Sequence, residues 1–249
     1  MAVDWTLVEL DTVDSTSSEV RRRALDGAPE GLAVTALAQT AGRGRQGRSF
    51  QSLAGKGLYL SVLLRPPSAE ELGELTPRAA VALCAALNSL HPDGYGVKWV
   101  NDVVLNGKKL AGILTECVFA PDGTPDFVVL GLGVNLSQTP ADFGPGLSSI
   151  ATSLGGTVDR HDLLRALLGE LGAMYRAFPG GHGPWLERYR RLCVTTGRAV
   201  TLVQGDRRRE AFAEAVNDDF SLLVRLPDGS RESVTSGEVS VRTPAGDYL

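Results

Sequence analysis

The sequence predicts an α+β protein in which antiparallel strands and helices precede a small all-β domain. Three observations predict this class. Asn106-Gly107 joins two apolar segments and is the strongest short signal for a β-hairpin. Apolar residues recur at helical spacing over about 160–178. After Arg198, short strand candidates alternate with turns, which is typical of a small barrel or sandwich.

The first half of the larger domain is predicted from local signals. A capping box at Thr16 and Glu19 predicts a helix over 17–26. Pro77 suits the first position of a second helix, which is expected to run to about residue 90. The strand candidates in this part of the chain are residues 3–10, 32–38 and 57–64.

Residues 94–136 predict a meander of antiparallel strands, 97–105, 109–119 and 126–136. The two-residue turn after the first of these sets a register in which Asp102 faces Ala111. Lys109 and Asp102 are then diagonal neighbours at best. Alternation along a single strand puts Lys98 and Asp102 on one face.

A boundary near residue 195 divides the chain into a domain of residues 1–195 and a domain of residues 196–249. Beyond the boundary, the strand candidates are 199–203, 208–216, 220–226, 231–235 and 238–242. Dipeptides such as Asp228-Gly229 supply the turns between them. Before the boundary, the helix over about 160–178 is expected to pack on the core.

Composition excludes several classes of protein. Of 249 residues, 43% are hydrophobic and 22% are charged, as in globular proteins. The longest apolar run, 79–87, is far shorter than the roughly 20 residues that cross a bilayer. The N-terminus lacks the pattern of a secretory signal, so a cytoplasmic location is expected. The net charge of −4 argues against a general nucleic-acid binder.

The cysteines and histidines are scattered. Cys84, Cys117 and Cys193 lie far apart in apolar surroundings and are expected to be reduced core residues. The three histidines are equally dispersed, which disfavours a hydrolase triad. No protein-bound metal site is expected.

The Gly/Arg segment at 42–48 is the most informative in the chain. It contains G-x-G-x-x-G. It also differs from a Walker A motif at a single position, where Arg48 replaces the lysine. Both motifs need a helix immediately afterwards, but the following serines and glycines are poor helix formers. No acid follows at the spacing that dinucleotide binding requires. The segment predicts a flexible loop whose guanidiniums bind phosphate or carboxylate. The alternative is a solvated basic loop.

Lysine is rare in this chain. Of 25 basic residues only four are lysines, and three of these lie between positions 98 and 109. This clustering indicates a need for compact ammonium groups. Lys109 and Asp102 could share a polyanion pocket. The alternative for the segment 98–102 is an exposed strand with salt bridges. Trp99 is expected in the core.

Several other positions have both an ordinary and a functional interpretation. Gly112 and the glycines of 131–135 expose bare backbone, either for a ligand or to relieve crowding in the sheet. Helix capping explains Ser15 and Thr16. Gln39 could be an ordinary surface residue.

Five segments in the same order resemble the biotin protein ligase family. The resemblance spans residues 12–242 and is specific because all five segments occur in register. Two positions depart from the family pattern: Ser17, often Asn, and Val100, often Pro. The segments are Ser15-Thr16, Gln39 to Arg48, Lys98-Trp99-x-Asn101-Asp102, Lys109 to Ile113, and Gly131-x-Gly133-x-Asn135.

The resemblance implies a fold like that of class II aminoacyl-tRNA synthetases, a mixed and mainly antiparallel sheet with flanking helices, followed by an SH3-like barrel. It implies a ligase that activates biotin with ATP and Mg²⁺ to biotinyl-5′-AMP. The biotin then passes to one lysine of the biotin carboxyl carrier domain of a biotin-dependent carboxylase. The resemblance allows a homodimer. We expect no operator binding, because only 14 residues precede Ser15; a sequence-specific gel shift of DNA would refute this.

The resemblance also implies roles for individual residues. Lys109 and Arg43 would offset the charge of the reacting anions, and Asp102 would orient the acceptor amine or receive its proton. The biotin-binding residues would be Ser15, Thr16, Ser17, Gln39, Arg43, Gly44, Arg45, Lys109 and Gly112. The nucleotide-binding residues would be Arg43, Arg45, Arg48, Phe50, Asn101, Asp102, Lys109 and Asn135.

Three rival functions remain at this point. A lipoate or octanoate ligase shares the fold and an active-site lysine but lacks the Arg/Gly loop. An anion-binding module without catalytic activity would release no pyrophosphate. A P-loop NTPase would produce ADP rather than AMP.

Overall fold

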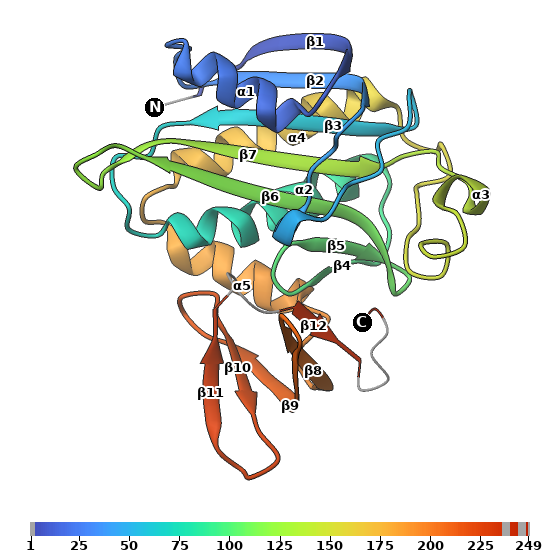
Figure 1. Cartoon of the computed structure of the whole chain (residues 1–249), viewed down its shortest axis with the longest axis vertical. Helices are drawn as coiled ribbons and strands as arrows, with labels where there is room; N and C mark the ends of the chain where they lie inside the picture. The colour runs from blue at the N-terminus through green and yellow to red at the C-terminus, as the bar shows by residue number, and fades with distance from the viewer. Residues whose placement is uncertain (1–2, 236–239, 244–247, 249) are drawn as a thin grey trace.

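The computed structural model describes residues 3–235, 240–243 and 248. Its larger part contains a seven-stranded sheet in the order β1-β2-β3-β7-β6-β5-β4, in which only β1 and β2 pair in parallel (Figure 1). The strands are β1 (Thr6–Val13), β2 (Leu32–Gln39), β3 (Gly57–Leu64), β4 (Tyr95–Lys98), β5 (Asp102–Leu105), β6 (Lys108–Phe119) and β7 (Pro125–Asn135).

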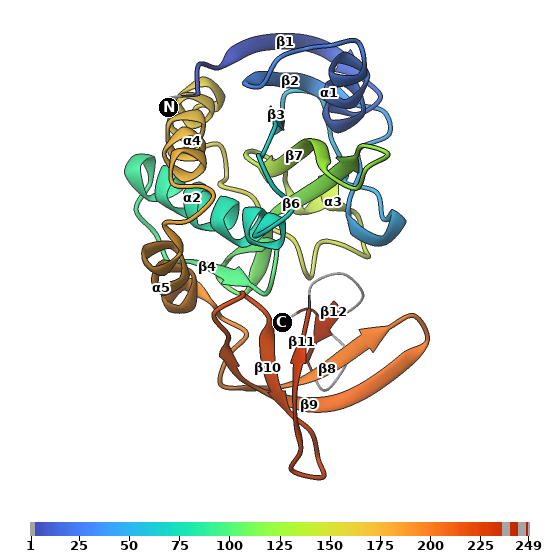
Figure 2. The ribbon, with the colours of Figure 1, turned by 90° about the vertical axis from the view of Figure 1, so that its left-hand side faces the viewer.

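Helices cover both faces of this sheet (Figure 2). Apolar side chains of α1 (Thr16–Leu25), including Val20, pack with Phe127 on one face. The opposite face is covered by α2 (Leu75–Leu90), α4 (Arg160–Arg176) and α5 (His182–Leu192), whose apolar side chains form the main core. Three shorter helical segments are η1 (Arg45–Gly47), η2 (Leu72–Glu74) and α3 (Pro140–Phe143).

The chain ends in a separate antiparallel sheet of five strands, in the order β11-β10-β9-β8-β12. These are β8 (Arg198–Gln204), β9 (Arg207–Val216), β10 (Leu222–Arg225), β11 (Arg231–Val234) and β12 (Ser240–Arg242). The predicted α+β class is thus confirmed. Among the described residues no pairing joins β11 to β12, and the start of the predicted strand 238–242 lies outside them.

The C-terminal sheet contacts the larger part at the turn between β4 and β5. The Trp99 backbone N–H donates to Thr195 Oγ1 at 2.9 Å, and the Trp99 indole N–H donates to the Phe220 carbonyl at 2.9 Å. The Trp99 side chain is buried, as predicted. Because this turn precedes Asn101 and Asp102, the C-terminal sheet helps to position both residues.

The predicted single strand 97–105 is wrong. The structure has two strands here, β4 and β5, which pair with each other in antiparallel fashion so that Lys98 faces Asp102. The break follows from the long-range hydrogen bonds of Trp99, which no local pattern reveals. The alternation argument for Lys98 and Asp102 therefore does not apply.

The helix boundaries also differ in part from the prediction. The Thr16 hydroxyl does not cap α1; Thr16 is already helical, and its side chain bonds Gln39 instead. Glu19 pairs with arginines of its own helix rather than completing a capping box. Helix α2 begins two residues before Pro77. No prediction covered α5, whose start is rich in Gly and Pro.

All three cysteines are free, and Cys84, a residue of α2, is buried in the main core. Burial raises the pKa of the Cys84 thiol to about 12. Since the thiolate is the nucleophile, we expect Cys84 to resist iodoacetamide in the native protein at mildly alkaline pH and to react readily in urea. Peptide mass spectrometry measures both rates; equal rates would contradict the burial of this thiol. Cys117, half-buried, serves as the internal comparison.

Within the described residues, no helix is both long enough and apolar enough to cross a membrane.

Candidate functional site

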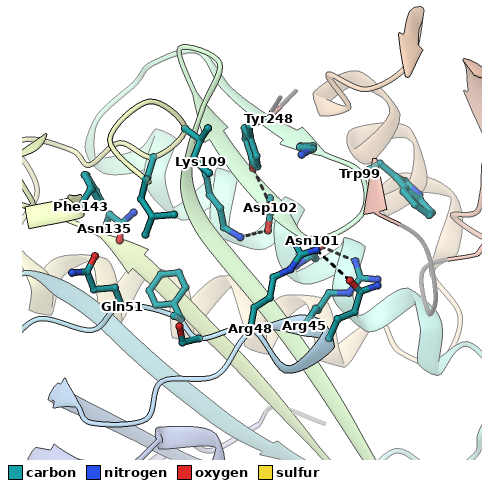
Figure 3. A pocket seen from close by; sticks show the side chains of 18 residues that line it. Arg45, Arg48, Gln51, Trp99, Asn101, Asp102, Lys109, Asn135, Phe143 and Tyr248 are labelled. Atoms are coloured by element: carbon teal, nitrogen blue, oxygen red, sulfur yellow. Dashed lines mark hydrogen bonds and ion pairs between the residues drawn. The ribbon is translucent and has the colours of Figure 1, made fainter. Parts of the chain in front are cut away.

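Two adjoining cavities lie on the sheet face that also carries α1, and Figure 3 shows the side chains that line the larger one. The larger compartment has a volume of about 220 Å³ and the smaller compartment about 50 Å³. They share lining residues from the Gly/Arg loop, the β4–β5 turn and β6. The shared residues are Gly44, Arg45, Phe50, Asn101 and Lys109.

Uncharged polar groups form one end of the smaller compartment. Gln39 Oε1 accepts from the Thr16 backbone N–H at 2.8 Å and from its hydroxyl at 3.1 Å. Ser61 Oγ lies 2.8 Å from Thr16 Oγ1 and 3.0 Å from Ser17 Oγ. Thr16, Ser17 and Ser61 are buried, so this network is a preformed set of donors and acceptors. Gln39 is not an ordinary surface residue.

Glycines of β6 and β7 let other groups approach the sheet closely. A Cβ atom at Gly131 would lie 2.6 Å from Ser17 Oγ, and one at Gly133 would lie 2.7 Å from the Phe50 ring. A Cβ atom at Gly112 would lie 3.2 Å from Lys109 Nζ. These glycines therefore leave room for side chains that line the two compartments.

The Gly/Arg loop folds back on itself rather than starting a helix. The Gly44 N–H donates to the Arg48 carbonyl at 2.7 Å, and the Phe50 N–H donates to the Gly42 carbonyl at 2.9 Å. Only the short η1 lies within the loop, and no helix follows before β3. The rejection of the Walker A and dinucleotide motifs is confirmed.

Cationic side chains meet at the junction of the compartments. Lys109 Nζ donates to Asp102 Oδ1 at 2.6 Å, and an Arg45 guanidinium N–H donates to Asn101 Oδ1 at 2.9 Å. The Asn101 amide in turn donates to the Ile113 carbonyl at 3.0 Å. Burial lowers the pKa of Arg45. Burial alone raises the pKa of Asp102, but Lys109, Lys98 and Tyr248 together lower it below its usual value.

The close Lys109 to Asp102 contact corrects the predicted register. Lys109 faces Val104, but the pairing shifts beyond it, so that Asp102 faces Gly112 rather than Ala111. This bulge turns the lysine and the carboxylate toward each other. A regular two-residue hairpin would have left them diagonal.

The loop arginines have different surroundings. The Arg43 guanidinium donates to Glu116 at 2.7 Å, and Arg43 lines only the smaller compartment. Arg48 lines only the larger one, whereas Arg45 lines both. Among the described arginines of the loop, Arg45 thus lies at the junction.

The structure gathers the sequence-predicted residues around these cavities. The smaller compartment is lined by Ser15, Thr16, Ser17, Gln39, Arg43, Gly44, Arg45, Lys109 and Gly112, the whole set expected for biotin. The larger compartment is lined by Arg45, Arg48, Phe50, Asn101, Asp102, Lys109 and Asn135, which is the set expected for the nucleotide apart from Arg43.

The segment 136–152 closes the far side of the larger compartment. The Lys109 N–H donates to the Ile150 carbonyl at 2.8 Å, and the Asn135 amide donates to the Thr152 carbonyl at 3.0 Å. Phe143 and Leu147 add an apolar wall. The compartment thus combines a basic junction with an apolar outer part.

Asp142 ties this segment to the sheet. Both Asp142 carboxylate oxygens accept from Lys56 Nζ at 2.6 Å. The hydrogen bonds from Lys56 and Thr139 lower the pKa of Asp142 to about 2. Because the folded pKa lies below the usual value of 3.8, this attachment is fully present above that pH and is lost as the pH falls toward about 2.

On the activity that the sequence resemblance implies, Asp142→Asn should raise the KM for the nucleotide about threefold. The effect is small because a partly exposed ion pair contributes little energy, but the pair positions the apolar wall. Steady-state kinetics of both substrates measures this effect. The KM for the acid substrate should not change. An equal change in both KM values would contradict a local role for Asp142.

Sequence reasoning missed several lining residues. Ser61 is the lone polar residue of the apolar strand β3, a signal that could have been noticed. Lys98 is buried rather than on an exposed strand. Phe143 and Tyr248 carry no local signal, because distant segments bring them to the larger compartment.

Comparisons with known proteins identify the family. The model for the biotin/lipoate A/B protein ligase family matches residues 10–135, and the model for the biotin protein ligase C terminal domain matches residues 195–242. The chain belongs to the biotin/lipoate A/B protein ligase family. Within it, the chain resembles biotin protein ligases along most of its length.

Three relatives illustrate this similarity. A bifunctional ligase/repressor, BirA, of Bacillus subtilis is 38% identical over 167 residues, 65% of this chain and 51% of that protein. The biotin--[acetyl-CoA-carboxylase] ligase of Mycobacterium tuberculosis is 33% identical over 241 residues, 93% of this chain and 88% of that protein. The structure of the Aquifex aeolicus biotin protein ligase in complex with biotin and ATP superposes with a TM-score of 0.81 at 27% identity, covering 96% and 99% of the two chains. The chain spans about half the length of the Bacillus relatives.

Proposed function

We propose that this protein is a ligase that activates biotin with MgATP to biotinyl-5′-AMP, releases pyrophosphate, and transfers biotin to a lysine of a biotin carboxyl carrier domain. The single observation that carries this proposal is the junction between two compartments of different character. One is small and lined by uncharged polar groups; the other is larger, basic and partly apolar. Lys109 and Arg45 line both.

The junction suits adenylation. Attack of a carboxylate on the α-phosphate brings two anions together, and fixed cations offset their repulsion and stabilise the charge that develops. The Lys109 ammonium would contact the acid and the phosphate at once. Holding both substrates in neighbouring compartments would supply much of the remaining rate enhancement.

The smaller compartment suits the ureido ring of biotin. Ser17, Thr16 and Ser61 offer hydroxyl groups, and Gln39 offers an amide, to a ligand head that carries both N–H and C=O groups. Lipoate and octanoate have no such polar head and would leave these buried groups without new partners. This difference favours biotin over both alternatives.

The larger compartment suits ATP. Lys98, Arg48 and Arg45 surround it, while Phe143 and Leu147 offer an apolar surface for a base. Magnesium would enter on the triphosphate and offset its charge. The Asp102 carboxylate is not assigned to the metal, because its two oxygens already accept hydrogen bonds from Lys109 and Tyr248.

We assign Asp102 to orienting Lys109 rather than to accepting a proton from the acceptor amine. Its pKa is lowered and its Oδ1 is bonded to Lys109, and both make it a weak base. Arg43 stays a predicted catalytic residue. For that role its guanidinium must leave Glu116 and turn toward the substrates.

The two domains have different functions in this proposal. We propose that residues 1–195 supply most of the biotin and ATP site, and that residues 196–249 support the β4–β5 turn through the bond from Trp99 to the Phe220 carbonyl and add Tyr248 to the larger compartment. We place this chemistry in the cytoplasm.

The test is incubation with ATP, Mg²⁺ and radiolabelled biotin, lipoate or octanoate, with and without a biotin carboxyl carrier domain. We expect biotin-dependent AMP and pyrophosphate and label on one carrier lysine. Labelling of the carrier by lipoate or octanoate but not by biotin would contradict biotin as the substrate. ADP as the product would contradict adenylation. Formation of the adenylate without labelling of the carrier would contradict the transfer step.

A further inference from the structure

Tyr248 lies far from most of the site in sequence, but its side chain reaches Asp102 (Figure 3). The Tyr248 hydroxyl donates to Asp102 Oδ2 at 3.0 Å. The centre of its ring lies 3.6 Å from Lys98 Nζ, a cation–π contact. The same side chain lines the larger compartment. Tyr248 is therefore part of the wall that faces the nucleotide.

The Asp102 carboxylate is held at both oxygens. Oδ1 accepts from Lys109 at 2.6 Å and Oδ2 accepts from Tyr248. Two hydrogen bonds on opposite oxygens fix the rotation of a carboxylate, whereas one leaves it free to turn. Because Asp102 orients Lys109, its fixed plane also fixes the position of the Lys109 ammonium at the junction.

We propose that Tyr248 is a positioning residue for the Asp102–Lys109 pair and that its ring completes the nucleotide compartment beside Lys98. The kinetic effects predicted below rest on the proposed function, whereas the contacts of Tyr248 do not depend on it. The competing interpretation is that Tyr248 occupies space the nucleotide needs and must leave before ATP binds. The two interpretations predict opposite changes in ATP binding.

Two variants separate the hydroxyl from the ring. Tyr248→Phe should lower kcat for adenylate formation about tenfold, the effect of a lost hydrogen bond to a charged group, without changing the KM for ATP. Tyr248→Leu should lower kcat similarly and also raise the KM for ATP, because the ring over Lys98 is lost. Lower KM values for ATP in both variants, or unchanged kcat in Tyr248→Phe, would overturn the proposal.

The pH dependence of kcat distinguishes a positioning role from a merely structural one, because loss of a structural contact would not shift the acid limb of the profile. The groups that face Asp102 are Lys109, Lys98, Arg45, Tyr189 and Tyr248 itself. The Tyr248 hydrogen bond is among the contacts that lower the pKa of Asp102. Its loss in Tyr248→Phe should raise that pKa and move the acid limb of the kcat profile to higher pH. An unmoved acid limb would contradict the positioning role.

A measurement without substrates tests the geometry. The chain has only four lysines, so ¹⁵N,¹³C-lysine labelling gives a simple NMR spectrum that Lys→Arg variants assign. We expect the Lys98 ε-methylene signals to be shifted upfield by the Tyr248 ring, to stay shifted in Tyr248→Phe and to lose the shift in Tyr248→Leu. Absence of this shift in the wild type would overturn the proposal. Its presence in a protein that makes no adenylate would instead refute the proposed function.

Discussion

Replacing Lys109 with arginine will slow adenylate formation about 100-fold, although the positive charge is kept. The Lys109 ammonium lies 2.6 Å from Asp102. Its end packs so closely over Gly112 that a Cβ there would lie 3.2 Å from Nζ. A planar guanidinium is larger and cannot fit its charge into the same point between acid and phosphate. Single-turnover formation of biotinyl-AMP measures the rate.

The matched control for this variant is Lys108→Arg. Lys108 neighbours Lys109 on β6, but its ammonium donates to the Ser148 carbonyl at 3.1 Å and does not line either compartment. We expect nearly normal adenylation in the control and unchanged thermal stability in both variants. Near-normal activity of Lys109→Arg would remove the argument for a point charge at the junction.

Replacing Gly131 with alanine will raise the Kd for biotin about tenfold or more, with the Kd for ATP unchanged. The new methyl group would lie 2.6 Å from Ser17 Oγ and 3.3 Å from Ser61 Oγ, inside a buried hydrogen-bonded network. Moving Ser17 breaks that network, and the loss of one or two hydrogen bonds at roughly 1 kcal/mol each lowers the affinity by about fivefold to thirtyfold. Calorimetric titration with biotin measures the change.

Two further variants test this explanation of the Gly131 effect. Gly169→Ala adds the same methyl group where no atom lies within 4 Å, and it should leave biotin binding unchanged. The double variant Gly131→Ala/Ser17→Ala removes the clash, so its affinity should exceed the value expected if the two effects were additive. If the losses of biotin affinity in the two single variants simply added up in the double variant, the methyl group would not act through Ser17.

Much of the fold could be predicted because its elements carry local signals. The Asn106-Gly107 turn predicted the hairpin of β5 and β6, and leucines at helical spacing predicted α4. The break at Trp99 could not be predicted, because it depends on partners at Thr195 and Phe220. Helix α5 was missed although Trp185, Leu186 and Tyr189 form an apolar stripe, since the glycines around its start resemble a loop.

Prediction of the candidate site from the sequence was limited in the same way. Each site residue that the resemblance implied lines one or both compartments, but the contacts of these residues depend on register and on distant segments. A bulge in the β5–β6 pairing decides whether Lys109 reaches Asp102, and a regular hairpin pattern does not encode it. Tyr248 reaches Asp102 across 146 positions, so no local motif could reveal it.

The most direct test is a crystal structure with a non-hydrolysable analogue of biotinyl-5′-AMP. We expect the ureido ring beside Gln39 and Ser17, the adenosine beside Phe143 and Asn135, and the linker within hydrogen-bonding distance of Lys109 Nζ. An analogue whose linker lies away from Lys109, or whose two ends occupy the opposite compartments, would contradict the assignment of the junction as the place where acid and phosphate meet.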